Sequence, residues 1–410
     1  MQKDFKFFTQ ISTSHSSLES LSPPSLRSTI EKAQAVLPLS GLIVGGLENP
    51  AVYDELTCNK KKGVPEVYLW YNLLSDYPGQ SGEDTIVDYH GRRCQNWFGW
   101  GEDAKEAIHE NFLFSCPNNP LAIQRTLKAL SDFLEKYAFD GVFLDKFRFP
   151  SPASGLDQTF SCFCPHCYAK AAAQGLDLRA VQQALCVWRK DELMGSANPT
   201  NWLEAVTERK DLVKRFLQFR IDSIFDLVKQ VREITNSFGI KLGLDLFTPA
   251  FANLVGESYT KLAPYADWIK PMVYQYAMGP AGIRLETKAL IEGLQNEFSL
   301  DENAIFTWTA ANFPWFTQDA YVQLRDSSVP LLWIAQEIRE ATRLTPLLPV
   351  YMGLEAVSFP GVIDIRPEMA AELFDTAYAN GANGVVLSWD LMHMPIENLR
   401  AIKDHYDTRK

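Results

Sequence analysis

The stretch LAIQRTLKALSDFLEKYAFDGVFLDKF (121–147) joins a helical pattern to a strand pattern. In its first part, apolar residues recur at intervals of three and four, which is typical of a helix with one buried face. Its second part, GVFLDKF (141–147), is an apolar run of strand length that begins at a glycine. The stretch therefore predicts a helix leading into a strand buried on both faces, which is the repeating unit of an α/β fold.

Units of the same kind recur along the chain. The other strand-length runs are 5–12, 41–46, 66–72, 241–247, 268–274, 349–355 and 384–390. Helical patterns start near Pro24, cover 50–61 and 367–380, end at Gly239, and begin again at about 395. Eight such units predict a single (β/α)8 TIM barrel over residues 1–410, with an open doubly wound sheet as the alternative.

Two long insertions interrupt the expected barrel. They cover about 75–117, after the third strand, and 148–200, after the fourth. Both would rise from the carboxyl ends of the strands, where barrel enzymes bind their substrates. The segment 305–311 could be a ninth strand, but we interpret it as part of an insertion between strands six and seven.

The chain carries 50 acidic against 39 basic residues, a net charge of −11. Such a chain repels phosphate backbones, so we expect no nucleic-acid partner. No apolar window is long enough to cross a membrane, and we see no signal peptide at the N-terminus. Seven cysteines, three of them crowded together, do not resemble a secreted disulfide framework. We therefore expect a cytoplasmic protein without a membrane partner.

Acidic residues fall at or near the ends of four expected strands. They are Asp145, Asp245, Glu355 and Asp390. Because strand side chains alternate between two faces, Asp145 shares a face with Phe143. A charged group at the end of a buried strand must reach the mouth of the barrel or lose its hydration at a large cost in free energy. We expect these four carboxyl groups to meet around the mouth.

Paired carboxyl groups are the machinery of glycoside hydrolysis. One donates a proton to the leaving oxygen, while the other attacks the anomeric carbon or activates water, and no cofactor is required. The competing interpretation is that some of these acids only form ion pairs with Lys146, Arg148 or Lys270.

Aromatic residues near the expected mouth also fit a sugar site, because sugar rings pack their C–H faces on flat aromatic surfaces. Arginine and amide side chains there could bond hydroxyl groups. The candidate substrate-binding residues are Trp70, Tyr71, Trp97, Trp100, Arg148, Tyr274, Gln275 and Trp389. The alternative for most of the tryptophans is a place in the core.

The segment DGVFLDKFRFPSP (140–152) resembles the strand-four motif of barrel glycoside hydrolases of the α-amylase and α-galactosidase type. The whole chain also resembles uncharacterised bacterial glycoside hydrolases of the barrel type, through FCPHC (163–167), KPMVY (270–274), PVYMGLE and GVVLSWD. The resemblance implies a retaining reaction on an oligo- or polysaccharide with Asp145 as the nucleophile. The acid/base stays open between Asp245 and Glu355. Phe143 stands where the amylase pattern has an arginine.

A C-x-C-x-x-C cluster lies in the second insertion. It is formed by Cys162, Cys164 and Cys167, with His166 inside it. Thiolates and imidazole are good zinc ligands, and a structural zinc site needs four of them. The candidates for the fourth ligand are His166, Cys116, Cys94 and Cys186. Free thiols in a packed loop are the alternative interpretation.

Three hypotheses about function follow from these patterns. The first is a retaining glycoside hydrolase. The second is a carbohydrate-binding barrel without catalysis, in which the acids only bond hydroxyl groups. The third is a zinc-dependent hydrolase that uses the cysteine cluster, although no H-x-H or H-E-x-x-H pattern supports catalytic zinc.

Overall fold

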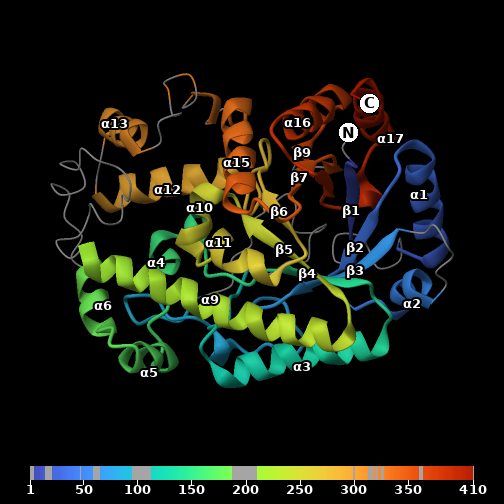
Figure 1. Cartoon of the computed structure of the whole chain (residues 1–410). Coiled ribbons are helices and arrows are strands. Elements are labelled where there is room, and N and C mark those ends of the chain that lie inside the picture. Colours follow the sequence, from blue (N-terminus) through green and yellow to red (C-terminus); the bar gives the residue numbers. More distant parts are fainter. Residues whose placement is uncertain are drawn as a thin grey trace.

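A computed structural model describes residues 4–13, 21–46, 48–58, 65–94, 112–186, 210–298, 301–312, 317, 319, 322–324, 327–359 and 363–409. Within these ranges a parallel sheet curls into a nearly closed barrel, with helices packed around its outside (Figure 1). The α/β class and the (β/α)8 TIM barrel expected from the sequence are thereby confirmed.

Eight strands make up the barrel. In sheet order they are β6 Trp268–Met272, β5 Lys241–Phe247, β4 Gly141–Asp145, β3 Glu66–Asn72, β2 Gly41–Gly45, β1 Lys6–Ser12, β10 Gly384–Ser388 and β7 Tyr351–Glu355. A parallel bridge between Ile269 and Val350 brings β6 to β7 and completes the circle. Because consecutive strands are neighbours all the way round, the alternative of an open doubly wound sheet is excluded.

The long helices lie outside the strands. They are α1 Pro23–Val36, α2 Pro50–Cys58, α3 Pro120–Lys136, α9 Lys210–Phe238, α12 Ile283–Phe298, α15 Leu331–Leu344, α16 Pro367–Ala379 and α17 Ile396–Thr408. The start of α3 shows how the sequence sets these bounds. Asn119 accepts hydrogen bonds from the backbone N–H groups of Leu121 and Ala122, and Pro120 fits the first helical position.

Shorter elements lie in the connections between the strands and the long helices. The helices are α4 Leu156–Thr159, α5 Pro165–Ala173, α6 Leu178–Cys186, α10 Pro249–Ala252, α11 Tyr259–Leu262 and α13 Glu302–Asn312. A small hairpin joins β8 Ser358–Phe359 to β9 Ile363–Asp364. Single 3-10 turns lie at η1 Gly82–Asp84, η3 Pro152–Ser154, η4 Asn253–Val255, η5 Ala263–Tyr265 and η6 Leu391–His393.

The segment 305–311, a candidate ninth strand, lies within helix α13. Its threonines fit a helix because the Thr307 and Thr309 hydroxyls donate to backbone carbonyls one turn earlier, those of Asn303 and Ile305. The segment thus belongs to an insertion between β6 and β7, and the possibility of a ninth strand is wrong.

An aromatic layer fills the barrel interior. Its members face inward from seven strands and are Phe8, Ile43, Tyr68, Phe143, Trp268, Tyr351 and Val386, with Trp70 packed against them. Trp268 stacks on Phe143 with ring centroids 5.3 Å apart. The next inward positions toward the carboxyl ends hold polar residues: Gln10 on β1, Asp145 on β4, Asp245 on β5 and Lys270 on β6. The aromatic layer is therefore the floor of a polar chamber.

Gly243 on β5 leaves the space that the Trp268 ring occupies. A methyl group there would overlap the indole. We predict that Gly243→Ala lowers the free energy of unfolding by about 1–3 kcal/mol, because the floor cannot take the extra group without moving. Urea denaturation would measure the change. Gly82→Ala is the matched control, since its methyl group would enter open space and should change stability by less than about 0.5 kcal/mol. Equal effects would contradict the tight packing of the floor.

Candidate active site

A cavity opens directly above the aromatic floor. Its volume is small, about 40 Å³. Strands far apart in sequence contribute to its wall, among them β1 with Gln10, β3 with Trp70, β4 with Asp145, β5 with Asp245 and β6 with Lys270. Its position at the carboxyl ends of the strands is where barrel enzymes hold their active sites.

Asp145 ends β4 with its carboxylate facing this cavity. The indole N–H of Trp70 donates to Oδ2 at 2.9 Å, and the backbone N–H of Lys146 donates to Oδ1 at 2.6 Å. Lys146 adopts a left-handed conformation, with φ of 50°, which is uncommon for a residue with a side chain. Each carboxylate oxygen of Asp145 is therefore fixed by its own N–H donor.

Asp245 lies on the same cavity wall but is more deeply buried, with 2% of its side chain exposed. The ammonium of Lys270 donates to Oδ2 at 3.0 Å and to Oε1 of Gln10 at 3.2 Å. Burial raises the pKa of Asp245 to about 8, the nearby Asp145 carboxylate adds to this rise, and Lys270 opposes it. Oδ1 of Asp245 has no hydrogen-bond partner in the described part of the chain.

Two further cations line the cavity. Lys146 forms an ion pair with Asp76 at 2.6 Å, and its ammonium lies 4.3 Å from the ring centroid of Phe112. Arg148 is stacked between aromatic rings, with its guanidinium carbon 4.3 Å from the centroid of Phe247. Burial lowers the pKa of Arg148, and surrounding carboxylates partly offset that effect. Arginine and lysine thus place hydrogen-bond donors beside both aspartates.

Tyr274 and Trp389 form an aromatic corner of the cavity. Their ring centroids are 5.6 Å apart and the planes are nearly perpendicular, at 73°. The Tyr274 hydroxyl lies 3.2 Å from Oγ of Ser388 and can donate to it, while burial raises the pKa of this phenol to about 12. Together with Trp70, these rings give the cavity flat apolar surfaces next to its charged groups.

Glu355 is placed differently from the sequence-based expectation. Its carboxylate accepts from the backbone N–H groups of Gln275, Tyr276 and Ala277, with shortest distances of 2.7, 3.1 and 2.7 Å. Burial raises its pKa to about 7, and these three donors oppose the rise. The residue fastens the loop after β6 and is not among those that line the cavity.

Asp390 and two of the expected binding residues also lie away from the cavity lining. Asp390 caps η6 by accepting a hydrogen bond from the backbone N–H of Met392, and the same oxygen accepts one from the backbone N–H of Ser12.

The expected binding residues differ in their positions. Tyr71 lies on the opposite face of β3 from Trp70, so it faces α3, and its hydroxyl donates to the Thr126 carbonyl at 2.6 Å. Gln275 is buried and donates to the Val329 carbonyl. Trp97 and Trp100 lie outside the described residues.

The structure adds residues that sequence reasoning did not assign to the site. Gln10 and Lys270 line the cavity, although Lys270 entered the sequence analysis only as an ion-pair partner. Each stands two positions after a residue of the aromatic floor, Phe8 and Trp268 respectively, so strand alternation could have found them. Phe112, also in the lining, follows no such pattern.

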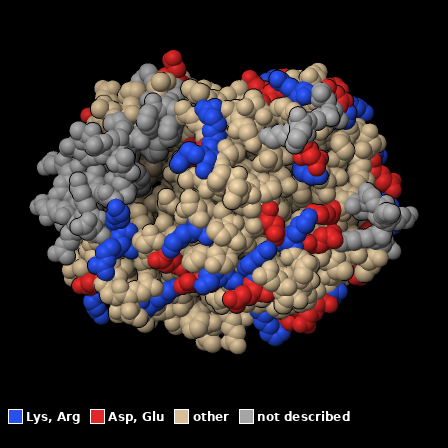
Figure 2. Space-filling view, in the orientation of Figure 1, with Lys and Arg blue, Asp and Glu red and all other residues tan. Residues whose placement is uncertain are grey.

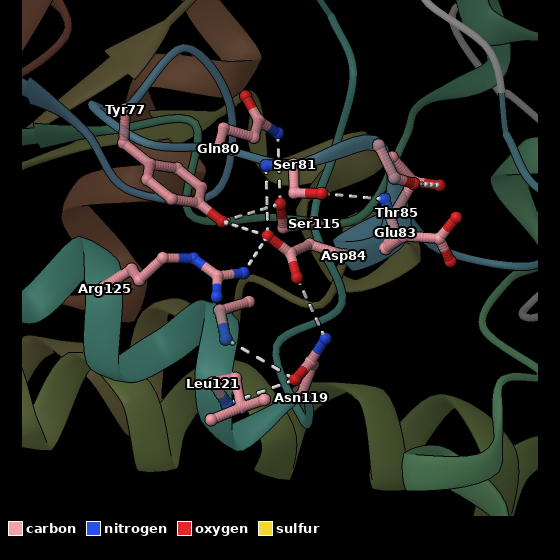
Figure 3. A network of polar contacts seen from close by, with 12 residues as sticks. Tyr77, Gln80, Ser81, Glu83, Asp84, Thr85, Ser115, Asn119, Leu121 and Arg125 are labelled. Carbon is pink, nitrogen blue, oxygen red and sulfur yellow. Dashed lines mark hydrogen bonds and ion pairs between the residues drawn. The ribbon is translucent and has the colours of Figure 1, made fainter.

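A polar network supports the first insertion (Figure 3). Asp84 accepts from the Ser81 backbone N–H at 3.1 Å and from the Asn119 side chain at 3.3 Å, and it forms an ion pair with Arg125 of α3. The Ser115 backbone N–H donates to the Leu74 carbonyl at 2.7 Å. The segment from Phe112 to Asn119 is thereby fixed to the loop that follows β3 and to α3.

Four cysteines gather at a second place, outside the cavity lining. Cys116, Cys162, Cys164 and Cys167 are buried, and their sulfur atoms all lie within 4.8 Å of one another. The sequence had marked the last three, and the structure brings in Cys116 from the four candidates for a fourth member. His166 is exposed on α5 and is not part of this group.

Comparison with known proteins places the fold but not a family. No protein-family model and no curated protein sequence matches the chain. The glycoside hydrolase domain of PgaB (BpsB) from Bordetella bronchiseptica superposes with a TM-score of 0.57 at 13% identity, covering 95% of each chain. A chitinase from Chromobacterium violaceum gives a TM-score of 0.46 at 11% identity, covering 98% of this chain and 99% of its own. The similarity to the PgaB domain, at this low identity, shows a shared fold.

The distribution of charged side chains on the surface fits the net negative charge of the sequence. On the face shown in Figure 2, described basic and acidic side chains are interspersed, without a broad basic patch. In the described ranges, every helix is too short or too polar to cross a membrane.

The contacts of Glu355 yield a prediction about stability. Glu355→Ala should lower the free energy of unfolding by about 2–4 kcal/mol, because it leaves three backbone N–H groups without their acceptor. Chemical denaturation followed by fluorescence would measure it. Glu372→Ala, at an exposed position of α16, is the matched control and should change stability by less than about 0.5 kcal/mol. A Glu355→Ala protein as stable as the control would argue against the loop-fastening role.

Proposed function

We propose that this protein is a glycoside hydrolase that cleaves an oligo- or polysaccharide with Asp145 and Asp245. The observation that carries the proposal is the convergence of these two carboxyl groups on one cavity with aromatic walls at the carboxyl ends of the strands. Two acids in different surroundings are what glycosidic cleavage needs. The fold likeness to a domain described as a glycoside hydrolase supports the same class.

Asp145 has the surroundings of the attacking group. It is the less buried of the two aspartates, with 8% of the residue exposed against 2% for Asp245. The Trp70 indole and the Lys146 backbone hold its two oxygens by N–H donors, which keeps the carboxylate in one orientation. The resemblance of the 140–152 segment to retaining barrel enzymes supports the role of nucleophile, and hence a retaining reaction.

Asp245 has the surroundings of the acid/base. With a pKa of about 8, it holds a proton near neutral pH that it can donate to the leaving oxygen. Lys270 limits the rise of that pKa through its ion pair, so the proton can also be released. Once Asp145 has formed a covalent bond to the sugar, Asp245 would take a proton from the incoming water.

Substrate contacts would come from the remaining cavity wall. Trp70, Tyr274 and Trp389 offer flat surfaces for the C–H faces of a sugar ring. Arg148, with a guanidinium that lies among carboxylates, and Gln10, with an Nε2 that has no acceptor in the described residues, would bond hydroxyl groups. The cavity thus combines apolar and polar surfaces in the manner of a carbohydrate site.

Asp145→Asn should abolish turnover of aryl glycosides and oligosaccharides while the protein stays folded. We expect kcat/KM to fall by at least about 10³-fold, because the amide cannot attack the anomeric carbon. Steady-state kinetics would measure this, with circular dichroism as the check on folding. NMR of the first-formed anomer would show retained configuration for the wild-type protein.

Asp132→Asn is the matched control for that variant, since Asp132 is exposed on α3 and pairs with Lys128. Its activity should equal that of the wild-type protein. Full activity in Asp145→Asn would overturn the assignment of the nucleophile. A wild-type protein that binds oligosaccharides but cleaves none would favour the carbohydrate-binding barrel instead.

The pH dependence tests the role of Asp245. Because the donor must carry its proton, activity should persist below its pKa and fall as the pH rises through about 8. In Lys270→Met the ion pair is lost, so the pKa of Asp245 should rise and the alkaline limb should move up by about 1 to 3 pH units. Profiles of log kcat/KM against pH would show the shift.

Lys146→Met provides the comparison, because Lys146 lines the same cavity but pairs with Asp76. Its alkaline limb should stay in place. An unchanged limb in Lys270→Met, or a shift toward lower pH, would contradict the role of Asp245 as the acid.

A further inference from the structure

The four clustered cysteines have the arrangement of a metal site. Sγ of Cys116 lies 3.5 Å from that of Cys167 and 3.4 Å from that of Cys164, and all four sulfurs are mutually within 4.8 Å. A zinc ion bound tetrahedrally at about 2.3 Å from each sulfur requires sulfur pairs about 3.8 Å apart. From this geometry we propose that Cys116, Cys162, Cys164 and Cys167 hold one structural zinc ion.

Backbone and amide N–H groups donate hydrogen bonds to the sulfur atoms of the cluster. The Val87 backbone N–H donates to Cys162, the Asn118 backbone N–H donates to Cys116, and the Asn118 amide donates to Cys167, each at 3.3 Å. A neutral thiol is a weak acceptor, whereas zinc-bound thiolates are accompanied by donors that orient them. Three of the four sulfurs have such a donor.

A buried cation stands beside the cluster. Arg220 of α9 is fully buried and lies within electrostatic range of Cys162 and Cys167. Its Nη1 donates to the Leu254 carbonyl at 2.8 Å, but its Nε and Nη2 have no hydrogen-bond partner among the described residues. The guanidinium carbon lies 4.3 Å from the ring centroid of Phe149, and a negative charge nearby would further offset the cost of its burial. Zinc with four thiolates carries a net charge of −2 and supplies one.

The backbone around the cluster also favours negative charge. Cys164 is the N-cap of α5 and Cys167 stands in its first turn. The start of a helix carries partial positive charge, and this stabilises thiolates there. The geometry, the donors, the buried arginine and the helix start therefore all point to an anionic cluster.

The proposed site joins segments that are far apart in the chain. Cys116 belongs to the insertion after β3, while the other three cysteines belong to the insertion after β4. The Asn118 amide reaches Cys167 of α5 and Ser223 of α9, which brings the start of α3 against both helices (Figure 1). Four protein ligands would leave no position for a water molecule, so this zinc would stabilise structure and take no part in hydrolysis.

Metal analysis of the full chain tests the proposal directly. Protein expressed in zinc-supplemented medium and freed of loose metal on a desalting column should contain about one zinc atom per chain. Cys116→Ser and Cys164→Ser should each lose at least about nine-tenths of that zinc, because three thiolates hold the ion far less tightly. Cys94→Ser is the matched control, a buried cysteine outside the cluster, and should keep its zinc.

A thiol titration of the wild-type chain keeps the test decisive if the variants fail to fold. Unfolding in guanidinium under non-reducing conditions should release zinc and seven reactive thiols together. Stripping the zinc with a strong chelator should lower the melting temperature of the wild-type protein and leave Cys116→Ser unchanged. A folded chain that contains no zinc and binds none after reduction would overturn the proposal. The proposal would also be overturned if some of the seven thiols were found in disulfide bonds, or if the bound metal were iron.

Discussion

The buried ion pair between Asp245 and Lys270 is the interaction on which the barrel interior depends. Both side chains are at most 2% exposed, and the buried Lys270 ammonium is stabilised there by the Asp245 carboxyl group and the Gln10 amide oxygen, which accept its hydrogen bonds. Gly353 leaves the space for the Lys270 side chain, since a methyl group at that position would press on Cε of the lysine. The packed rings of the aromatic floor lie next to this pair, and apolar surroundings strengthen electrostatic interactions.

Strand alternation explains how much of the site could be predicted from the sequence. The barrel follows from the apolar runs of strand length, and the inward direction of Asp145, Trp70 and Tyr274 follows from alternation along each strand. Trp389 lines the cavity although alternation from the inward-facing Val386 would turn it outward. The same rule, applied strictly, turns Tyr71 toward α3. Strand alternation could not predict the surroundings of Glu355, because the carboxylate of this residue accepts hydrogen bonds from three backbone N–H groups of the loop after β6.

The cysteine cluster shows a different limit. Three of its members, Cys162, Cys164 and Cys167, lie close together in the sequence, so their spacing was enough to predict a cluster. Cys116 joins them only because the network around Asp84 holds the segment before α3 in place and Asn118 bridges α5 and α9. Arg220 carries no sequence signal at all, since an arginine within a long amphipathic helix is ordinarily solvent-exposed.

The residues that fix the two insertions are different from the aspartates proposed to carry out the reaction. Phe112 and Arg148, which line the cavity, belong to the same two insertions that the cysteine cluster and the Asp84 network tie together. The carboxyl groups stand on strands, whose positions are set by the barrel itself. Insertions would otherwise be the least ordered part of a barrel mouth, yet productive geometry tolerates displacements of only about 0.5 Å. The contacts that fix both insertions lie outside the cavity, and they hold the part of the cavity wall that the insertions form. The two aspartates proposed to react take no part in these contacts.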